Sequence, residues 1–176
     1  MNSELEVWQR GPIDGVPALL QPVAHALLQA VEDVEKALDN FSPDLIGETP
    51  AGVASVGFHL KHLKGVLDRL FTYARGEKLS EEQLNYLKAE TITVTSDSVP
   101  ALVSNFKKQV DATIDELKGA DINQLTDHRA VGRKQIPSTV MGLWFHAAEH
   151  TQRHVGQLIV TARILKAGKV LNNRMG

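Results

Sequence analysis

Apolar residues recur every three or four positions along most of the chain, which is the spacing of an amphipathic helix with one buried face. Four long stripes of this kind stand out, near residues 14–40, 50–75, 98–118 and 138–167. The pattern therefore predicts four long amphipathic helices. Four such helices joined by short or medium connections form a four-helix bundle, so the expected fold class is all-α.

Residues at the ends of the stripes refine these limits. Serine or threonine accepts a backbone hydrogen bond at a helix N-terminus, proline fits the first turn, and glycine suits the position just past the C-terminus. On this basis the predicted N-caps are Thr49, Ser98 and Ser138, and the predicted C-terminal glycines are Gly76 and Gly119.

The segments between and after the stripes have other patterns. Ser80 followed by Gln83 forms a capping-box-like sequence, which predicts a short extra helix. Residues 120–136 are polar and irregular, with a short β-prone stretch around Ala130, and they precede the last long helix. After Gly168 we expect a frayed tail.

The composition is that of an ordinary globular protein. Hydrophobic residues make up 43% of the 176 residues, enough for a sizeable core, and the length favours one domain over residues 1–176. A formal net charge of −2 provides no basic field for nucleic acid. The lack of cysteine excludes a disulfide framework, a cysteine zinc finger and a cysteine nucleophile supplied by this chain. No apolar run has membrane-spanning length, so we expect a cytoplasmic protein with no membrane partner.

Five of the seven histidines lie in two short segments. His146, His150 and His154 are four residues apart on the fourth predicted helix, and His59 and His62 are three apart on the second. Both spacings place side chains on one helical face. A lone helical histidine is more often a core or boundary residue than a ligand. Several imidazoles facing a bundle interior are expensive to desolvate without partners, however, so the cluster predicts a divalent metal site.

Helix geometry limits which histidines can share one ion. His146 and His154 lie about 12 Å apart along the helix axis, whereas zinc–nitrogen bonds are only about 2.0–2.1 Å long. The ion can therefore take His150 with either His146 or His154, and its third ligand comes from His59 or His62. The same segment lacks the glutamate of a zincin helix, which excludes a metalloprotease of that class.

Both histidine segments are similar to motifs of the DinB/YfiT-like superfamily of metal-binding four-helix bundles. Residues 150–157 resemble its His-x-x-x-His-x-Gly-Gln motif, and residues 55–63 resemble its small-apolar-aromatic-x-x-x-His-Leu signature. Many members carry a glutamate directly after the first histidine of the pair, where this chain has Thr151. The resemblance covers nearly the whole chain. It implies the metal ligands His62, His150 and His154, with His59, His146 and Glu149 around them.

The resemblance also carries expectations about function. It implies a low-molecular-weight thiol, such as bacillithiol or mycothiol, as cosubstrate with a small electrophilic substrate. Imidazole ligands suit zinc, nickel, copper and iron alike, and of these we expect zinc or nickel. The reaction would be that of a transferase or isomerase, and the sequence assigns no catalytic residue. The alternatives are a non-catalytic metal-binding or stress-response bundle, and a histidine-rich bundle without a physiological metal.

The sequence also leads us to expect a homodimer. Members of the resembled family commonly form homodimers, and alanines widen the apolar stripe of the first predicted helix, where they would permit close approach of a second helix. The same alanines could instead pack within the bundle. The residues concerned are Leu19, Ala24, Ala26, Ala30 and Ala37.

Overall fold

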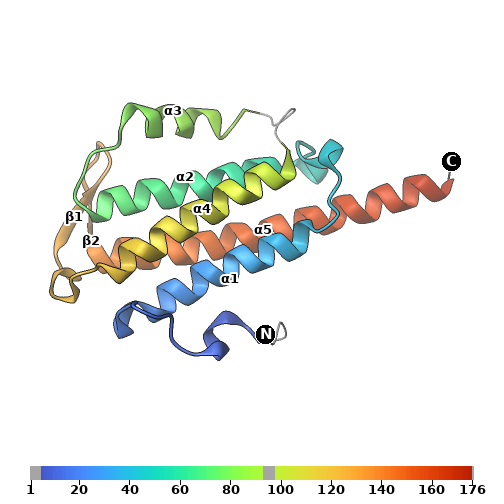
Figure 1. The fold of residues 1–176 in the computed structure, drawn as a ribbon. Helices are drawn as coiled ribbons and strands as arrows, with labels where there is room; N and C mark the ends of the chain where they lie inside the picture. The colour runs from blue at the N-terminus through green and yellow to red at the C-terminus, as the bar shows by residue number, and fades with distance from the viewer. Residues whose placement is uncertain (1–4, 93–97, 176) are drawn as a thin grey trace.

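Four long helices form the body of the protein in the computed structural model, which describes residues 5–92 and 98–175, with side chains as far as Lys169. Figure 1 shows them running along a common direction. Helices α1 and α2 each pack against both α4 and α5, which closes a ring of four. The predicted all-α four-helix bundle is confirmed. The long helices are α1 (Gln21–Leu38), α2 (Val56–Ala74), α4 (Val99–Lys118) and α5 (Val140–Met175).

Smaller elements lie around this ring of helices. Helix α3 (Glu81–Ala89) lies against the outer side of α2, and the strands β1 (His128–Val131) and β2 (Ile136–Thr139) form an antiparallel hairpin before α5. The capping box predicted from Ser80 and Gln83 is present at the start of α3. Single 3₁₀ turns cover Val7–Arg10, Ala18–Leu20, Pro43–Leu45, Pro50–Gly52 and Ile122–Gln124.

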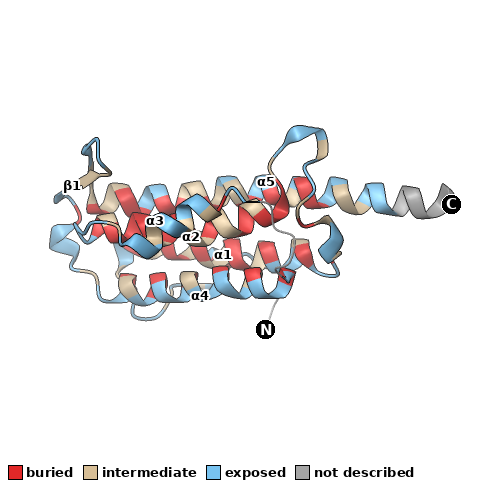
Figure 2. Cartoon of the chain, turned by 90° about the horizontal axis from the view of Figure 1, so that it is seen from above, coloured by how far each residue is buried: buried red, intermediate tan, exposed pale blue. Residues whose placement is uncertain are grey.

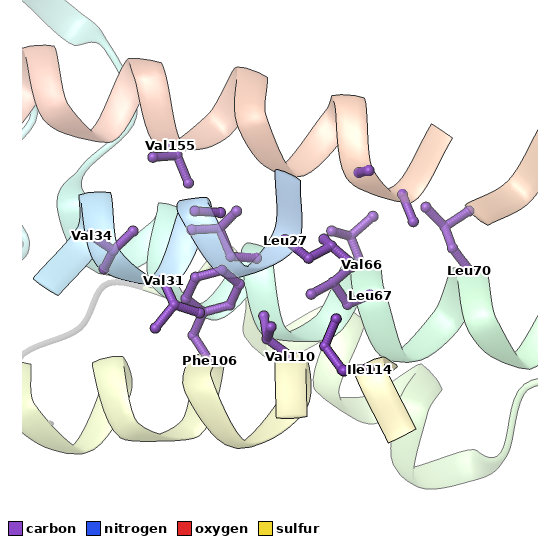
Figure 3. Close-up of a cluster of buried hydrophobic side chains, with 14 of the residues drawn as sticks. Leu27, Val31, Val34, Val66, Leu67, Leu70, Phe106, Val110, Ile114 and Val155 are labelled. Carbon is purple, nitrogen blue, oxygen red and sulfur yellow. The ribbon is translucent and has the colours of Figure 1, made fainter. Parts of the chain in front are cut away.

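One continuous apolar core fills the space between the four helices. Figure 2 shows the buried residues on the faces that the long helices turn toward one another, and Figure 3 shows side chains from all four helices pointing into the same interior. Phe106 of α4 and Leu27 of α1 are completely buried there. In the described part of the chain, no helix combines the length and the apolar character needed to cross a membrane.

The alanines of α1 pack within the bundle of the single chain. Ala24 and Ala30 are fully buried, and Ala26 and Ala37 pack against the same core, whereas Leu19 is exposed. The homodimer therefore draws no support from these alanines and stays a prediction.

The start of α2 differs from the sequence prediction. Thr49 makes no capping hydrogen bond, and Pro50 opens only a single 3₁₀ turn in which Ala51 has a left-handed φ of 52°. A residue in that conformation cannot continue a right-handed helix. The α-helix begins at Val56, where the Ser55 side chain accepts a hydrogen bond from the backbone N–H of Phe58.

Replacing Ser55 with alanine should therefore destabilise the metal-free protein by about 1 kcal/mol, because a capping hydrogen bond is lost. The matched variant Thr49→Ala removes a hydroxyl that caps nothing and should change the free energy of unfolding by less than about 0.5 kcal/mol. Urea denaturation measures both. Equal effects of the two substitutions would contradict the capping role of Ser55.

Helix α5 also departs from its predicted limits at both ends. Ser138, the expected cap, lies in strand β2, and the Thr139 hydroxyl instead accepts a hydrogen bond from the Gly142 N–H at 3.0 Å. At the other end, the helix continues through Gly168 to Met175 rather than ending near residue 167. Helix α4 agrees with its prediction, since Ser98 caps it and Gly119 follows it.

Candidate metal centre

The histidines of α2 and α5 meet where these two helices pack together. Ser55 caps α2 and so places His59 and His62 within its first two turns, while His150 and His154 lie one turn apart on α5. The Nε2 atom of His62 lies 3.0 Å from the Nε2 atom of His150. One ring nitrogen from each of His62, His150 and His154 lies within 4.8 Å of the other two. The structure thus brings together three histidines that are separated by up to 92 positions in sequence (154 − 62).

This donor set suits a divalent ion. Two imidazole nitrogens on one tetrahedral zinc lie about 3.3 Å apart, given zinc–nitrogen bonds of about 2.0–2.1 Å. The Nε2 atoms of His62 and His150 are already close to that separation. Imidazole ligands also suit nickel, copper and iron, so the donors do not select one metal. Together with His154, these residues could hold a metal ion.

Burial and neighbouring charges favour the neutral form of His59, His150 and His154. Burial, and after it the charge of His62, lowers the pKa of His59 to about 4. Burial and the charges of the neighbouring histidines lower the pKa of His154 to about 4, and burial likewise lowers the pKa of His150. A histidine must be neutral to bind a metal. His150 and His154 are therefore ready to act as ligands at neutral pH.

His59 lies behind the three clustered histidines. The residue is only 2% exposed, and its Nδ1 atom lies 3.1 Å from Nδ1 of His154. One of these two nitrogens donates the shared hydrogen bond and the other accepts it. The ring of Phe58 stacks on His62 with centroids 5.4 Å apart and an interplanar angle of 9°. His59 and Phe58 therefore restrain the rings of His154 and His62.

His146 and Glu149 lie at the outer edge of the cluster together with Arg153. The Glu149 carboxylate accepts hydrogen bonds from Nδ1 of His146 and from Nη2 of Arg153, both at 2.6 Å. The side chains of His146 and Arg153 are 49% and 56% exposed, against 17% for His62. These three residues thus form a solvated rim, and the carboxylate of Glu149 is engaged there.

The buried carboxylate of the site is Glu90, which the sequence did not reveal. It follows the last residue of α3, and its Oε2 atom accepts a hydrogen bond from Nδ1 of His62 at 2.8 Å. Arg69 of α2 donates to the other oxygen, Oε1. Burial raises the pKa of Glu90, but the hydrogen bonds from His62 and Arg69 and the charge of Arg69 outweigh burial, so the pKa is lowered overall.

One sequence signal could have pointed to such a carboxylate. Arg69 lies seven residues after His62, among the apolar residues of the α2 stripe, and a buried arginine is almost always paired. Nothing in the spacing of Glu90, 28 positions after His62, identifies it as the partner.

Four helices in a ring, with three histidines gathered between two of them, define a helical bundle with a candidate metal centre. The chain belongs to the DinB superfamily, whose family model matches residues 6–158. The expected family membership is thereby confirmed. No curated protein matches the chain.

A solved structure supports the fold. The crystal structure of a DinB-like protein from Bacillus cereus ATCC 10987 superposes with a TM-score of 0.59 at 19% sequence identity. The match covers 81% of this chain and 91% of that one. At this level of identity, the likeness concerns the fold alone.

Proposed function

We propose that this protein binds one divalent metal ion through His62, His150 and His154, and that it uses the ion in a transferase or isomerase reaction with a low-molecular-weight thiol. The observation that carries the proposal is the convergence of three imidazole nitrogens from two helices within 4.8 Å. The lowered pKa values of His150 and His154 support it, because protons compete weakly with a metal at these two residues.

The proposed chemistry follows from the number of protein donors. A divalent ion held by only three protein ligands keeps coordination positions open and lowers the pKa of a thiol that joins it. The thiol would come from outside, since the chain contains no cysteine. Zinc and nickel are the proposed metals.

The rim indicates how small molecules would reach the histidines. His146 and Arg153 are exposed beside the cluster, whereas His59 closes its inner side. A thiol and an electrophile would therefore approach across the rim. The paired charges of Glu149 and Arg153 leave this entrance close to neutral at the point of approach.

Protein purified without a histidine tag should contain about one zinc or nickel ion per chain, because three preformed donors bind far more tightly than scattered surface histidines. Elemental analysis after gel filtration measures the ratio. Dialysis against a chelator should remove the ion, and added zinc or nickel should restore it. Protein that takes up neither metal after such treatment would contradict the proposal.

The thiol is tested on the same preparation with cobalt in place of the native metal. Addition of a low-molecular-weight thiol should change the visible absorption of the cobalt protein, because a new ligand alters the metal's electronic surroundings. Cysteamine and a thioether of the same size form a matched pair of probes. A spectrum that responds to neither, together with no turnover of an electrophile, would leave a non-catalytic metal-binding protein.

A further inference from the structure

The contacts of Glu90 form a closed network between α2 and the end of α3. Glu90 is only 3% exposed, and both of its oxygens are used, Oε1 by Arg69 and Oε2 by His62. Burying a carboxylate is unfavourable unless it is paired and hydrogen-bonded. A residue at the end of a short surface helix could be solvated at no such cost. Its burial against His62 therefore needs an explanation beyond the docking of α3.

Gly65 of α2 makes room for this carboxylate. A Cβ atom at Gly65 would overlap Oε1 of Glu90 and would also crowd Nη1 of Arg69 and the ring of Tyr86. Glycine inside a helix costs about 0.5–1 kcal/mol relative to alanine. Helix α2 carries this unfavourable residue at the point where the Glu90 carboxylate approaches its backbone.

The hydrogen bond from His62 fixes the chemistry of that imidazole. Since Glu90 is ionised and can only accept, Nδ1 of His62 donates to it, and the lone pair of the neutral ring then lies on Nε2. Nε2 is the atom that faces His150. Nδ1 of His150 is buried without a hydrogen-bond partner, and His154 shares its Nδ1 contact with His59. Within the described residues, Glu90 is therefore the carboxylate that orients a clustered histidine.

Helix α3 holds Glu90 in place through its own polar contacts. Nζ of Lys61, the residue before His62, donates to the carbonyl oxygens of Ala89 at 2.8 Å and Ile92 at 2.6 Å, on either side of Glu90. The Tyr86 hydroxyl donates to the Lys61 carbonyl oxygen at 3.2 Å. The same turn of α2 thus carries the oriented histidine and the lysine that anchors its partner.

We infer that Glu90 is a positioning residue of the metal centre, which fixes the tautomer and ring orientation of His62 and makes its Nε2 atom a stronger ligand. The inference rests on the proposed metal binding by His62, His150 and His154. Partners of this kind typically contribute 10–100-fold to metal affinity. On this assignment, the role of α3 is to place the Glu90 carboxylate beside His62.

The test compares Glu90→Gln with Glu116→Gln in the full chain. Glu116 is a partly buried carboxylate paired with Arg75 at the far end of α2, so its substitution removes a carboxylate–arginine pair away from the histidines. Zinc affinity is measured by competition with a chromophoric chelator. Glu90→Gln should weaken zinc binding about 10- to 100-fold and alter the visible spectrum of the cobalt-loaded protein. Glu116→Gln should leave affinity within about twofold and the spectrum unchanged.

A second pair of variants leaves every charged residue in place. Gly65→Ala inserts a methyl group against the Glu90 carboxylate, whereas Gly168→Ala on α5 meets open space. Gly65→Ala should weaken zinc binding as Glu90→Gln does, and Gly168→Ala should not. This pair also decides the matter if Glu90→Gln fails to fold.

The outcomes separate the inference from the function on which it rests. Wild-type protein that binds no zinc would overturn both. Tight zinc binding by the wild type, with unchanged affinity and cobalt spectrum in Glu90→Gln and Gly65→Ala, would overturn the positioning role alone. A lower melting temperature of the metal-free variants without a change in the cobalt spectrum would likewise reduce Glu90 to a purely structural ion pair.

Discussion

Replacing His150 with alanine is expected to lower metal affinity by at least about a hundredfold, more than the loss of a partner that only orients a ligand. The physical reason is its position in the cluster. The Nε2 atoms of His150 and His62 lie 3.0 Å apart, and His150 lies one helical turn from His154. Without His150, only one donor remains on each of the two helices. His62→Ala and His154→Ala should have effects of the same order.

Control variants distinguish ligands from neighbours. His146→Ala removes an exposed rim imidazole and His59→Ala a buried one behind His154, and both should weaken binding less than His150→Ala. His25→Ala is the remote control, since His25 lies on α1 and its ring contacts the carbonyl oxygen of Gly11, before that helix. Zinc competition and elemental analysis rank all of these variants. A loss at His59 or His146 that equals the loss at His150 would overturn the ligand assignment.

The metal-free protein is expected to lose stability as the pH falls from about 6.5 toward 4. The pKa of His59 is about 4 in the folded protein against 6.5 for an unperturbed histidine. Between these values the unfolded chain binds a proton at His59 that the folded chain does not, so the free energy of unfolding decreases as the pH falls. At pH 5 this single group contributes a loss of about 2 kcal/mol relative to pH 7.5.

Other titratable groups also change how the free energy of unfolding depends on pH. His154, with a pKa lowered to about 4, acts in the same direction as His59. Glu90, with a pKa below its ordinary 4.5, adds a loss only at still lower pH. Burial of Glu116 raises its pKa, and that carboxyl therefore acts in the opposite direction.

Urea unfolding of chelator-treated protein at several pH values measures the effect. His59→Gln should flatten the slope between pH 6.5 and 4, because the substituted side chain does not titrate. Identical slopes in the wild type and His59→Gln would contradict the buried neutral state of His59.

The architecture was accessible from the sequence because it depends on local periodicity. The stripes predicted near residues 14–40, 50–75 and 98–118 give each helix one apolar face, and that face determines which side of the helix turns inward. Residue type alone does not locate the N-cap of α2. Thr49 before Pro50 and Ser55 before Val56 have the same local signature, and only the left-handed Ala51 between them decides for Ser55.

The site was accessible in part. Spacing shows that His150 and His154 share a helical face, but it cannot show which of His59 and His62 faces them, because residues three apart point in nearly the same direction. The family motif selects His62, and the structure places His62 in the cluster. Its role as a ligand stays a prediction. Glu90 was out of reach, since its pairing with His62 is a tertiary contact with no local pattern.

Helix α3 is attached by polar contacts, and this attachment has a measurable consequence for hydrogen exchange. None of its residues from Glu81 to Ala89 is buried, and the sensitivity of an opening reaction to denaturant scales with the surface it exposes. Amide hydrogens of α3 should therefore exchange at a rate nearly independent of low urea concentration, while those of α2 follow global unfolding. Thermodynamic reciprocity adds that an ion bound more tightly when Glu90 is docked must slow this exchange by the same factor. Amide exchange in α3, at the surface of the protein, would then show whether the metal centre is occupied.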